Sequence, residues 1–416
     1  MADRPAPQAM RIVIINDAGV ARGGATGLAL LSARLLRANG YAVTYICGDG
    51  GDDGALEAEG VEVIPLGGAS LRSRGRLKVM RQGLYDQGVL DRVSRIIAET
   101  DTPRTVYHLH GWAQILSPSV IDALAPVAAR TFIHAHDFFL ACPNGAYFDF
   151  GSGTPCARTP LSAACLATAC DKRSFAQKAW RAARQVRVRR VLGGGRNWAG
   201  ILQLHEGMTD GLVRGGVPAQ LLRTVRNPAT ALLSERIEAE RNQRFVFLGR
   251  TEPGKGVGRL CKAARAAGVP LRIVGSVDER PDLVRDYPEV DFTGWVGKAD
   301  MARVLRDCRA LVMPSRFTEP FGLVAPEASL SGLPVAISSV ALLARDISDA
   351  GLGVSIDVGS TDALAADLRR FAARPNDEIR AMSMAGFSGR NSVAQTPDAW
   401  IDQLLGLYHA ALVSAE

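Results

Sequence analysis

Short apolar runs alternate with longer amphipathic stretches along most of the chain. The runs are rich in Val, Ile, Leu and Phe, and the stretches place apolar residues three or four positions apart. Such runs predict strands buried on both faces, and such stretches predict helices that cover them. In the first half we expect strands at 11–15, 43–46, 61–64, 106–109, 131–135, 200–204 and 221–225. The alternation predicts a parallel sheet with helices on both faces.

A second series of strands begins at 244–248, after a break in the pattern at Asn227 and Pro228. Further strands are expected at 271–274, 290–292, 310–313, 335–337 and 353–356. Each series opens with a strand, a glycine-bearing turn and a helix. This repeated opening predicts an α/β chain of two facing Rossmann-like domains, 1–226 and 227–395, with a cleft between them. We expect residues 396–416 to form a helix that packs back on the domain junction.

The composition narrows the class of protein. Of the 416 residues, 47% are hydrophobic and 22% are charged, a balance that excludes a largely disordered chain. No apolar run reaches the roughly 18 residues of a membrane span, and the first residues lack the apolar stretch of a secretory signal. We therefore expect a cytoplasmic protein, in which seven cysteines argue against a disulfide framework.

Two glutamates eight positions apart follow the predicted strand 310–313. We expect Glu319 in the loop after this strand and Glu327 in the next helix, both at the carboxyl edge of the sheet, where open α/β folds bind ligands. A carboxylate accepts two hydrogen bonds side by side, which suits a sugar or ribose diol. The alternative is a solvated helix with incidental acids. The surrounding sequence, S-R-F-x-E-P-F-G-L-V-x-P-E, favours a binding site.

The loop after strand 244–248 carries two cations, Arg250 and Lys255, that are expected to point toward the same edge. They would supply the positive charge that a diphosphate needs, and no Asp-x-Asp motif offers a divalent metal in their place. The loop lacks the P-loop spacing because Lys255 is followed by glycine, which disfavours an ATPase. A surface turn with ordinary charges is the alternative.

Taken in order, three features of the chain resemble the family-4 retaining glycosyltransferases of the GT-B fold. They are the turn with Gly23 and Gly24, the G-R-x4-K-G loop and the E-x7-E pair. The resemblance covers the whole chain and implies a UDP- or GDP-sugar donor in the cleft, bound mostly by the C-terminal domain. It implies a metal-independent, hexosyltransferase-type reaction with no cofactor for catalysis.

The resemblance also implies roles for individual residues. Arg250 and Lys255 would hold the diphosphate, Glu327 the ribose hydroxyls, and Glu319 the hydroxyls of the transferred sugar. Backbone amides would support the phosphates from either side, at the turn of Gly23 and Gly24 and at Gly322 and Leu323. The base would contact Trp295 and Val296.

A histidine-rich strand end completes the expected site. His136 and Asp137 end the strand 131–135, and the resemblance matches His136 to a histidine that approaches the donor sugar. His110 ends the predicted strand 106–109, where it either meets the acceptor or is a satisfied structural histidine.

The expected function follows from the resemblance and from charge. As the bond to phosphate breaks, negative charge grows on the diphosphate, and fixed cations stabilise that transition state. The acceptor is expected to be a glycan or a lipid-linked sugar of envelope or exopolysaccharide synthesis. One alternative is a nucleotide-sugar epimerase or hydrolase of the same fold. The other is a nucleic-acid-binding protein, suggested by the net charge of +7 but disfavoured because aromatic residues make up only 6% and no recognition motif appears.

Four cysteines fall within 29 residues, in an expected irregular insertion over 141–172: Cys142, Cys156, Cys165 and Cys170. Four thiolates can close a tetrahedral zinc site that folds such a loop. Their spacing lacks the short C-x2-C knuckle, so a structural zinc and buried free thiols both remain open. An iron–sulfur cluster is less favoured than either.

The stretch 172–196 holds nine basic residues and no acid, and a second basic patch spans 72–81. A basic amphipathic helix attracts anionic lipid headgroups or a phosphate-bearing acceptor. We therefore weigh a peripheral position at the inner membrane face against a solvated, arginine-rich helix.

Overall fold

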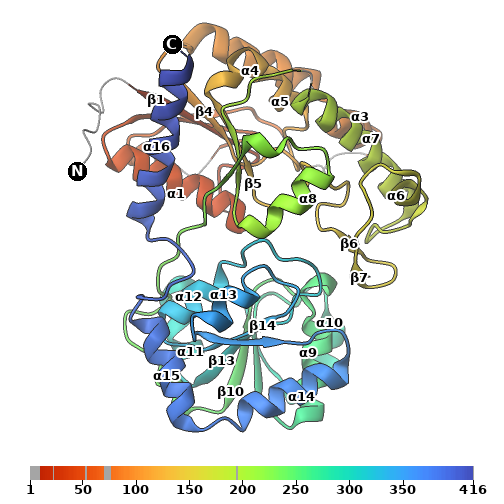
Figure 1. Ribbon diagram of the computed structural model, residues 1–416, viewed down its shortest axis with the longest axis vertical. Helices are drawn as coiled ribbons and strands as arrows, with labels where there is room; N and C mark the ends of the chain where they lie inside the picture. The colour runs from red at the N-terminus through yellow and green to blue at the C-terminus, as the bar shows by residue number, and fades with distance from the viewer. Residues whose placement is uncertain (1–9, 22, 52–53, 70–75, 194, 416) are drawn as a thin grey trace. The chain divides into compact units, whose positions relative to one another are not determined.

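The computed structural model describes residues 10–21, 23–51, 54–69, 76–193 and 195–415 (Figure 1). They form two compact units. The first unit comprises the described residues up to 151, those between 156 and 226, and those from Pro397 to 415. The second unit comprises residues 152–155 and 227–396.

The first unit is built on a seven-stranded parallel sheet in the order β3-β2-β1-β4-β5-β8-β9. The strands are β1 (Arg11–Asn16), β2 (Ala42–Cys47), β3 (Glu62–Pro65), β4 (Thr105–Leu109), β5 (Thr131–Ala135), β8 (Gly200–Gln203) and β9 (Leu222–Thr224). The central strands β4 and β5 are buried throughout, as their apolar sequences predict.

The helices of the first unit are α1 (Gly24–Ala38), α2 (Ala55–Ala58), α3 (Arg76–Leu84), α4 (Gln87–Thr100), α5 (Ser119–Ala123), α6 (Ala163–Ala167), α7 (Phe175–Leu192), α8 (Thr209–Arg214) and α16 (Pro397–Ala415). The last helix packs beside α1 in the first unit and buries Trp400, Leu404 and Tyr408. The C-terminal segment therefore completes the core of the first unit rather than that of the second.

The second unit holds a six-stranded parallel sheet in the order β12-β11-β10-β13-β14-β15. Its strands are β10 (Arg244–Leu248), β11 (Leu271–Val274), β12 (Asp291–Gly294), β13 (Cys308–Met313), β14 (Val335–Ser338) and β15 (Gly353–Ile356). Its helices are α9 (Val257–Ala267), α10 (Pro281–Asp286), α11 (Met301–Leu305), α12 (Val324–Leu330), α13 (Ala344–Asp349), α14 (Thr361–Ala372) and α15 (Asn376–Phe387).

The strand order of the second sheet reverses between β10 and β13, which are neighbours. In open α/β sheets ligands bind outside the carboxyl ends of the strands at such a switch point. The loops that follow β10 and β13 therefore meet at the expected ligand edge. These are the loops that carry the predicted Lys255 and Glu319.

The segment expected as an irregular insertion after β5 contains only short elements: β6 (Phe148–Asp149), β7 (Thr154–Pro155) and α6. Among the described helices of the whole chain, none is both long and apolar enough to cross a bilayer.

Candidate active site

An ion pair joins the two loops at the switch point of the second sheet. Lys255 Nζ lies 2.6 Å from Oε2 and 2.8 Å from Oε1 of Glu319. The hydroxyl of Ser315 donates to the same carboxylate at 2.8 Å. The Lys255 and Glu319 side chains are 24% and 13% exposed, so the pair is largely enclosed but can still be reached from solvent.

Glycines allow the two loops to come this close. Gly256 follows Lys255 with φ of 77°, and a Cβ there would lie 2.2 Å from the carbonyl oxygen of Pro314, at the end of β13. Gly322 has φ of 65°, and a Cβ would lie 2.8 Å from the sulfur of Met313. A positive φ is readily adopted only by glycine. Both positions therefore fix the backbone on either side of the ion pair.

The structure brings Lys255 to Glu319, but it does not bring Arg250 there. The Arg250 side chain is 67% exposed and pairs with Glu252 at 3.0 Å. Exposed ion pairs of this kind contribute little to stability. Arg250 therefore remains at the start of the loop after β10, apart from the Lys255–Glu319 pair.

Other residues predicted for the donor lie on the same unit. Glu327 is half-buried in the first turn of α12, and the Gly322–Leu323 backbone leads into that helix. Trp295 directly follows β12 and is 80% exposed, next to the half-buried Val296. A large aromatic face in solvent is an uncommon feature, and it is available for stacking.

In the first unit, the predicted turn of Gly23 and Gly24 leads directly into α1, which begins at Gly24. Gly23 is the N-cap residue, and no side chain caps the helix. The first-turn amides of a helix have no partner within it, so Gly24 lies where an anion is favoured. Among the described residues, apart from its chain neighbours, nothing lies within 4 Å of the position that a Cβ on Gly23 would take.

Four histidines cluster on one face of the first sheet. They come from alternate positions of adjacent strand ends, so they share that face: His108 and His110 from β4, and His134 and His136 from β5. His110 Nδ1 lies 3.0 Å from His136 Nε2, and His108 Nε2 lies 3.1 Å from His134 Nδ1. His108 Nδ1 also bonds the Tyr408 hydroxyl at 2.6 Å. His110 and His136, predicted separately, thus form one hydrogen-bonded pair.

All four imidazoles are held neutral. Burial lowers the pKa of His136 to about 3, and burial with mutual repulsion places the pKa of the other three well below the usual value. Three buried ring nitrogens, His110 Nε2, His134 Nε2 and His136 Nδ1, have no hydrogen-bond partner among the described residues. Nδ1 of His136 is therefore a neutral ring nitrogen without a partner among the described residues, while Nε2 of the same ring is bonded to His110.

Asp137 lies next to this cluster. Its carboxylate accepts the backbone N–H of Phe139 at 2.8 Å, and burial raises its pKa to about 6.

We expect acid to destabilise the protein through these histidines. In the unfolded chain each imidazole binds a proton below about pH 6.5, whereas in the fold burial keeps it neutral. Because the unfolded chain then binds more protons, the free energy of unfolding falls as pH drops below that value. The slope reaches about 1.4 kcal/mol per pH unit for each histidine, and for His136 it persists down to the folded pKa.

NMR titration of the ring carbons checks this expectation. The four buried rings should stay neutral at pH 5.5, about one unit below the usual pKa. A ring in the cluster that titrates near 6.5 in the folded protein contradicts the buried, neutral arrangement.

The sequence missed His108 and His134 as members of this cluster. The signal was available in the H-x-H spacing at the ends of two strands, because positions two apart share a face. Only the pairing of β4 with β5 brings the two H-x-H sets together.

The expected row of exposed cations over 172–196 is wrong at three positions on α7. Lys178 is 1% exposed and Arg184 is 7% exposed, while Arg181 pairs with the enclosed carboxylate of Asp171 at 3.2 Å. Arg187 and Arg190 do face solvent. Residues 72–75 of the second basic patch lie outside the described residues. The helix α7 therefore does not present a continuous row of exposed cations.

The family model that matches this chain does so within the second unit. Residues 242–374 match the family model of glycosyl transferases group 1. D-inositol 3-phosphate glycosyltransferase of Segniliparus rotundus is 32% identical over 187 residues, which is 41% of this chain and 40% of that protein. An uncharacterised 41.2 kDa protein in the cps region of Klebsiella pneumoniae is 35% identical over 122 residues, 27% of this chain and 32% of that protein.

Solved structures match the whole chain at low sequence identity. Sucrose-phosphate synthase of Thermosynechococcus elongatus superposes with a TM-score of 0.71 at 19% identity, covering 97% of this chain and all of that one. HepE of Anabaena in complex with UDP-glucose gives a TM-score of 0.65 at 15% identity, covering 97% of this chain and all of that one.

The solved structures confirm the predicted GT-B fold, and the family-model match relates residues 242–374 to glycosyl transferases group 1. The chain spans between a third and two fifths of the length of the curated relatives it matches first (40% and 32%). Its activity, donor, acceptor, stereochemistry and place in family 4 therefore remain predictions.

Proposed function

We propose that this chain, with its GT-B fold and its glycosyl transferases group 1 segment, moves a sugar from a nucleotide-sugar donor to a glycan or lipid-linked acceptor. The proposed reaction retains the anomeric configuration, uses no metal ion and transfers a hexose. The observation that carries the proposal is the Lys255–Glu319 pair at the switch point of the second sheet. A cation and a carboxylate at this edge are suited to a diphosphate and to the sugar attached to it.

Lys255 is the group that we expect to bind the diphosphate. Its ammonium has three N–H donors, and its hydrogen-bond acceptors among the described residues are the two oxygens of Glu319. One N–H is therefore left for a phosphate oxygen. The carboxylate holds the ammonium in place, so positive charge is positioned before the donor arrives and costs no reorganisation during the reaction.

Glu319 is expected to accept hydrogen bonds from hydroxyls of the transferred sugar. Its two oxygens offer about four lone-pair sites, of which Lys255 and Ser315 use three. The remaining lone-pair site, on a carboxylate whose orientation Lys255 and Ser315 fix, would favour a sugar that has a hydroxyl at the matching position. Such a buried polar site rejects an analogue that lacks the hydroxyl, because the carboxylate is then left without its partner.

The other donor contacts follow the resemblance. The exposed guanidinium of Arg250 can leave Glu252 for a phosphate, because their ion pair stabilises little. The carboxylate of Glu327 would bind the ribose hydroxyls, and the exposed ring of Trp295, with Val296, would contact the base. The backbone amides of Gly322 and Leu323 would add donors to the phosphates.

For the first unit, the proposal keeps the roles that the resemblance implies. The turn of Gly23 and Gly24 would bind a phosphate, and His136 would contact the transferred sugar. His110 and Asp137 would belong to the acceptor side. Because His136 is neutral, it would act as a hydrogen-bond partner rather than as a cation beside the positive charge that grows on the sugar.

The chemistry needs no protein nucleophile. The bond from the sugar to the diphosphate breaks, and the acceptor oxygen attacks from the same face. The leaving phosphate takes the acceptor proton. Lys255 and Arg250 stabilise the negative charge that develops on the diphosphate, which lowers the barrier because this charge is larger in the transition state than in the bound donor.

The relatives support an envelope or polysaccharide acceptor and a UDP-type donor. A further relative, from Mycobacterium leprae, is named phosphatidyl-myo-inositol mannosyltransferase, and HepE was solved with UDP-glucose. A cytoplasmic position at an anionic membrane surface remains part of the proposal, with Arg187 and Arg190 as its exposed cations on α7. The inward-facing cations of α7 weaken the nucleic-acid alternative further.

Thermal-shift titration against a panel of UDP-, GDP- and ADP-sugars tests the proposal. We expect one nucleotide class to raise the unfolding midpoint, by an amount that grows with ligand concentration. Nucleotide release is then measured with and without an acceptor mixture. A transferase releases nucleotide only when the acceptor is present, whereas a hydrolase releases it in water alone. No shift with any nucleotide sugar would overturn the proposal.

A further inference from the structure

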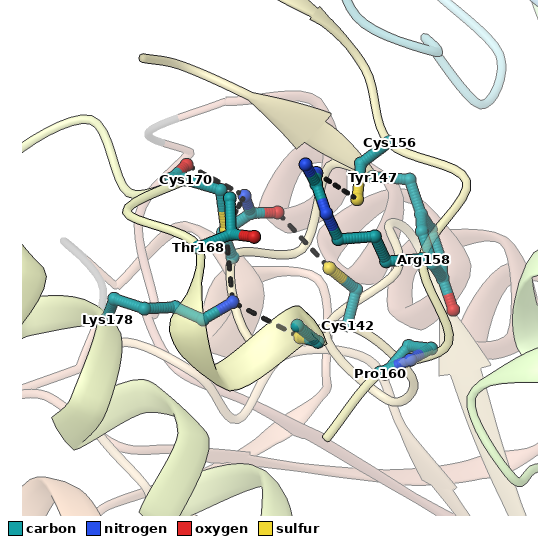
Figure 2. Close-up of a pocket in the computed structure, with 10 residues that line it drawn as sticks. Cys142, Tyr147, Cys156, Arg158, Pro160, Thr168, Cys170 and Lys178 are labelled. Atoms are coloured by element: carbon teal, nitrogen blue, oxygen red, sulfur yellow. Dashed lines mark hydrogen bonds between the residues drawn. The ribbon is translucent and has the colours of Figure 1, made fainter. Parts of the chain in front are cut away.

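The four clustered cysteines line one small cavity in the segment that follows β5 (Figure 2). Cys142, Cys165 and Cys170 are buried, Cys156 is half-buried, and all four are free thiols. Figure 2 shows Cys142, Cys156 and Cys170 around this common space. The volume of the cavity, about 10 Å³, suits a single ion or water.

A buried lysine reaches into the same cavity. Lys178, on α7, donates to the sulfur of Cys170 at 3.0 Å and to that of Cys165 at 3.3 Å. It is 1% exposed. In the part of the chain that the structure describes, its side chain pairs with no carboxylate.

A buried ammonium without a counter-charge is costly. Cysteine binds a metal as the thiolate. Lys178 places a cationic hydrogen-bond donor beside two of the four sulfurs, where it would support thiolate ligands of a metal ion.

Other polar groups surround the sulfurs, and one of them, Oδ1 of Asn144, accepts a hydrogen bond from the Cys142 thiol at 3.2 Å. The amide of Asn144 points its nitrogen to Cys170 at 3.5 Å, and the guanidinium of Arg158 lies 3.7 Å from the sulfur of Cys156. Four thiolates around Zn²⁺ carry a net charge of −2 (four negative charges and two positive), which the charge of Lys178 offsets in part. Arg158, beside Cys156, also pairs with Asp149 at 3.4 Å. Hydrogen bonds from such outer groups typically fix and tune metal ligands.

The structure assigns to Cys142, Cys156, Cys165 and Cys170 a structural Zn²⁺ site, with Lys178 as a hydrogen-bond donor to two of the thiolates. The four sulfurs line the cavity, but they are too far apart to bind one ion without moving. Among the described residues, no three of these sulfurs lie within 4.8 Å of one another. Zinc would draw the sulfurs inward, to about 2.3 Å from the ion, which the short elements of this segment permit.

The expected role of the ion is to fold the segment that follows the predicted site. The backbone N–H of Cys142 donates to the carbonyl of Phe138 at 2.7 Å, directly after His136 and Asp137. A zinc bound by Cys142 would thereby fix the chain where it leaves β5. This inference does not rest on the proposed glycosyl transfer, because metal content is measured without donor or acceptor.

Metal analysis of the full-length protein, purified without chelators, tests the site. We expect about one zinc per chain in the wild type. The substitutions C165S and C170S should each lower the bound zinc at least tenfold at equal free metal, whereas C47S and C261S, at buried cysteines outside the cluster, should retain it. Less than half an equivalent of zinc in the wild type would overturn the assignment, and no variant is needed for that measurement.

A second variant isolates the lysine. Lys178→Met removes the charge while keeping most of the side-chain volume, so we expect zinc to bind about 10- to 100-fold more weakly. The matched change Lys172→Met, at an exposed lysine, should leave the affinity unchanged. Cobalt substitution of the wild type should give the absorption of tetrahedral thiolate coordination. Intact disulfides in the native protein, or unchanged zinc affinity in K178M, would contradict the proposal.

Discussion

Replacing Lys255 by alanine is expected to lower kcat/KM for the sugar donor by about 10²–10³-fold. The ammonium is the cation that the structure fixes at the switch point, 2.6 Å from Glu319. Without it, charge on the leaving diphosphate loses a preorganised partner, and Glu319 loses the group that orients it. The measurement is donor turnover with the nucleotide class that the thermal-shift panel identifies.

Lys262→Ala is the matched control, because Lys262 lies exposed on α9, the helix that follows the same loop. It removes the same charge from the helix that follows the loop of Lys255, and we expect activity within about twofold of wild type. The thermal shift produced by the donor should be lost in K255A and kept in K262A. Equal losses in both variants would mean that net charge, rather than the position of Lys255, governs donor binding.

Replacing Gly256 by alanine should damage both stability and activity. The new Cβ would lie 2.2 Å from the carbonyl oxygen of Pro314, in a backbone conformation with φ of 77°. The left-handed conformation costs about 1–2 kcal/mol for an L-residue, and the overpacking adds about 1–3 kcal/mol. Because the loop must move away from β13, Lys255 would shift relative to Glu319, and a displacement near 1 Å can lower the rate about 10²-fold.

Gly268→Ala separates these two costs. Gly268 has φ of 69°, but a Cβ there meets no atom within 4 Å. We therefore expect G268A to lose only the stability that the left-handed backbone conformation costs, and to keep wild-type activity. Thermal unfolding midpoints and donor turnover of both variants provide the comparison. If G256A were no less stable and no less active than G268A, the close approach of the two loops would not matter for the site.

The sheets were predictable because their strands are almost uniformly apolar. The strands β5, β10, β11 and β15 begin and end where the sequence predicts. The error at β13, which begins at Cys308 rather than at 310, has a physical reason. In the sequence, the charged Arg309 indicates that the strand has not yet begun. In the structure its buried guanidinium donates to the carbonyl oxygens of Asn242 and Arg374, so the strand includes it.

The site was predictable to the extent that it depends on strand ends. Lys255 and Glu319 each follow a strand, and the carboxyl ends of adjacent parallel strands share an edge. Their direct contact was not predictable, because it depends on Gly256 and Gly322 permitting two loops to approach. Lys178 was misread as part of a solvent-facing row, since only tertiary packing shows that it is turned into the cysteine cavity.

The most direct test of the central claim is a crystal structure of the protein with a nucleotide sugar bound. The account predicts Lys255 Nζ at about 2.7–3.2 Å from a diphosphate oxygen, with the Glu319 carboxylate accepting a hydroxyl of the transferred sugar. A diphosphate bound away from the loops that follow β10 and β13, with Lys255 still bonded to Glu319 alone, would contradict it.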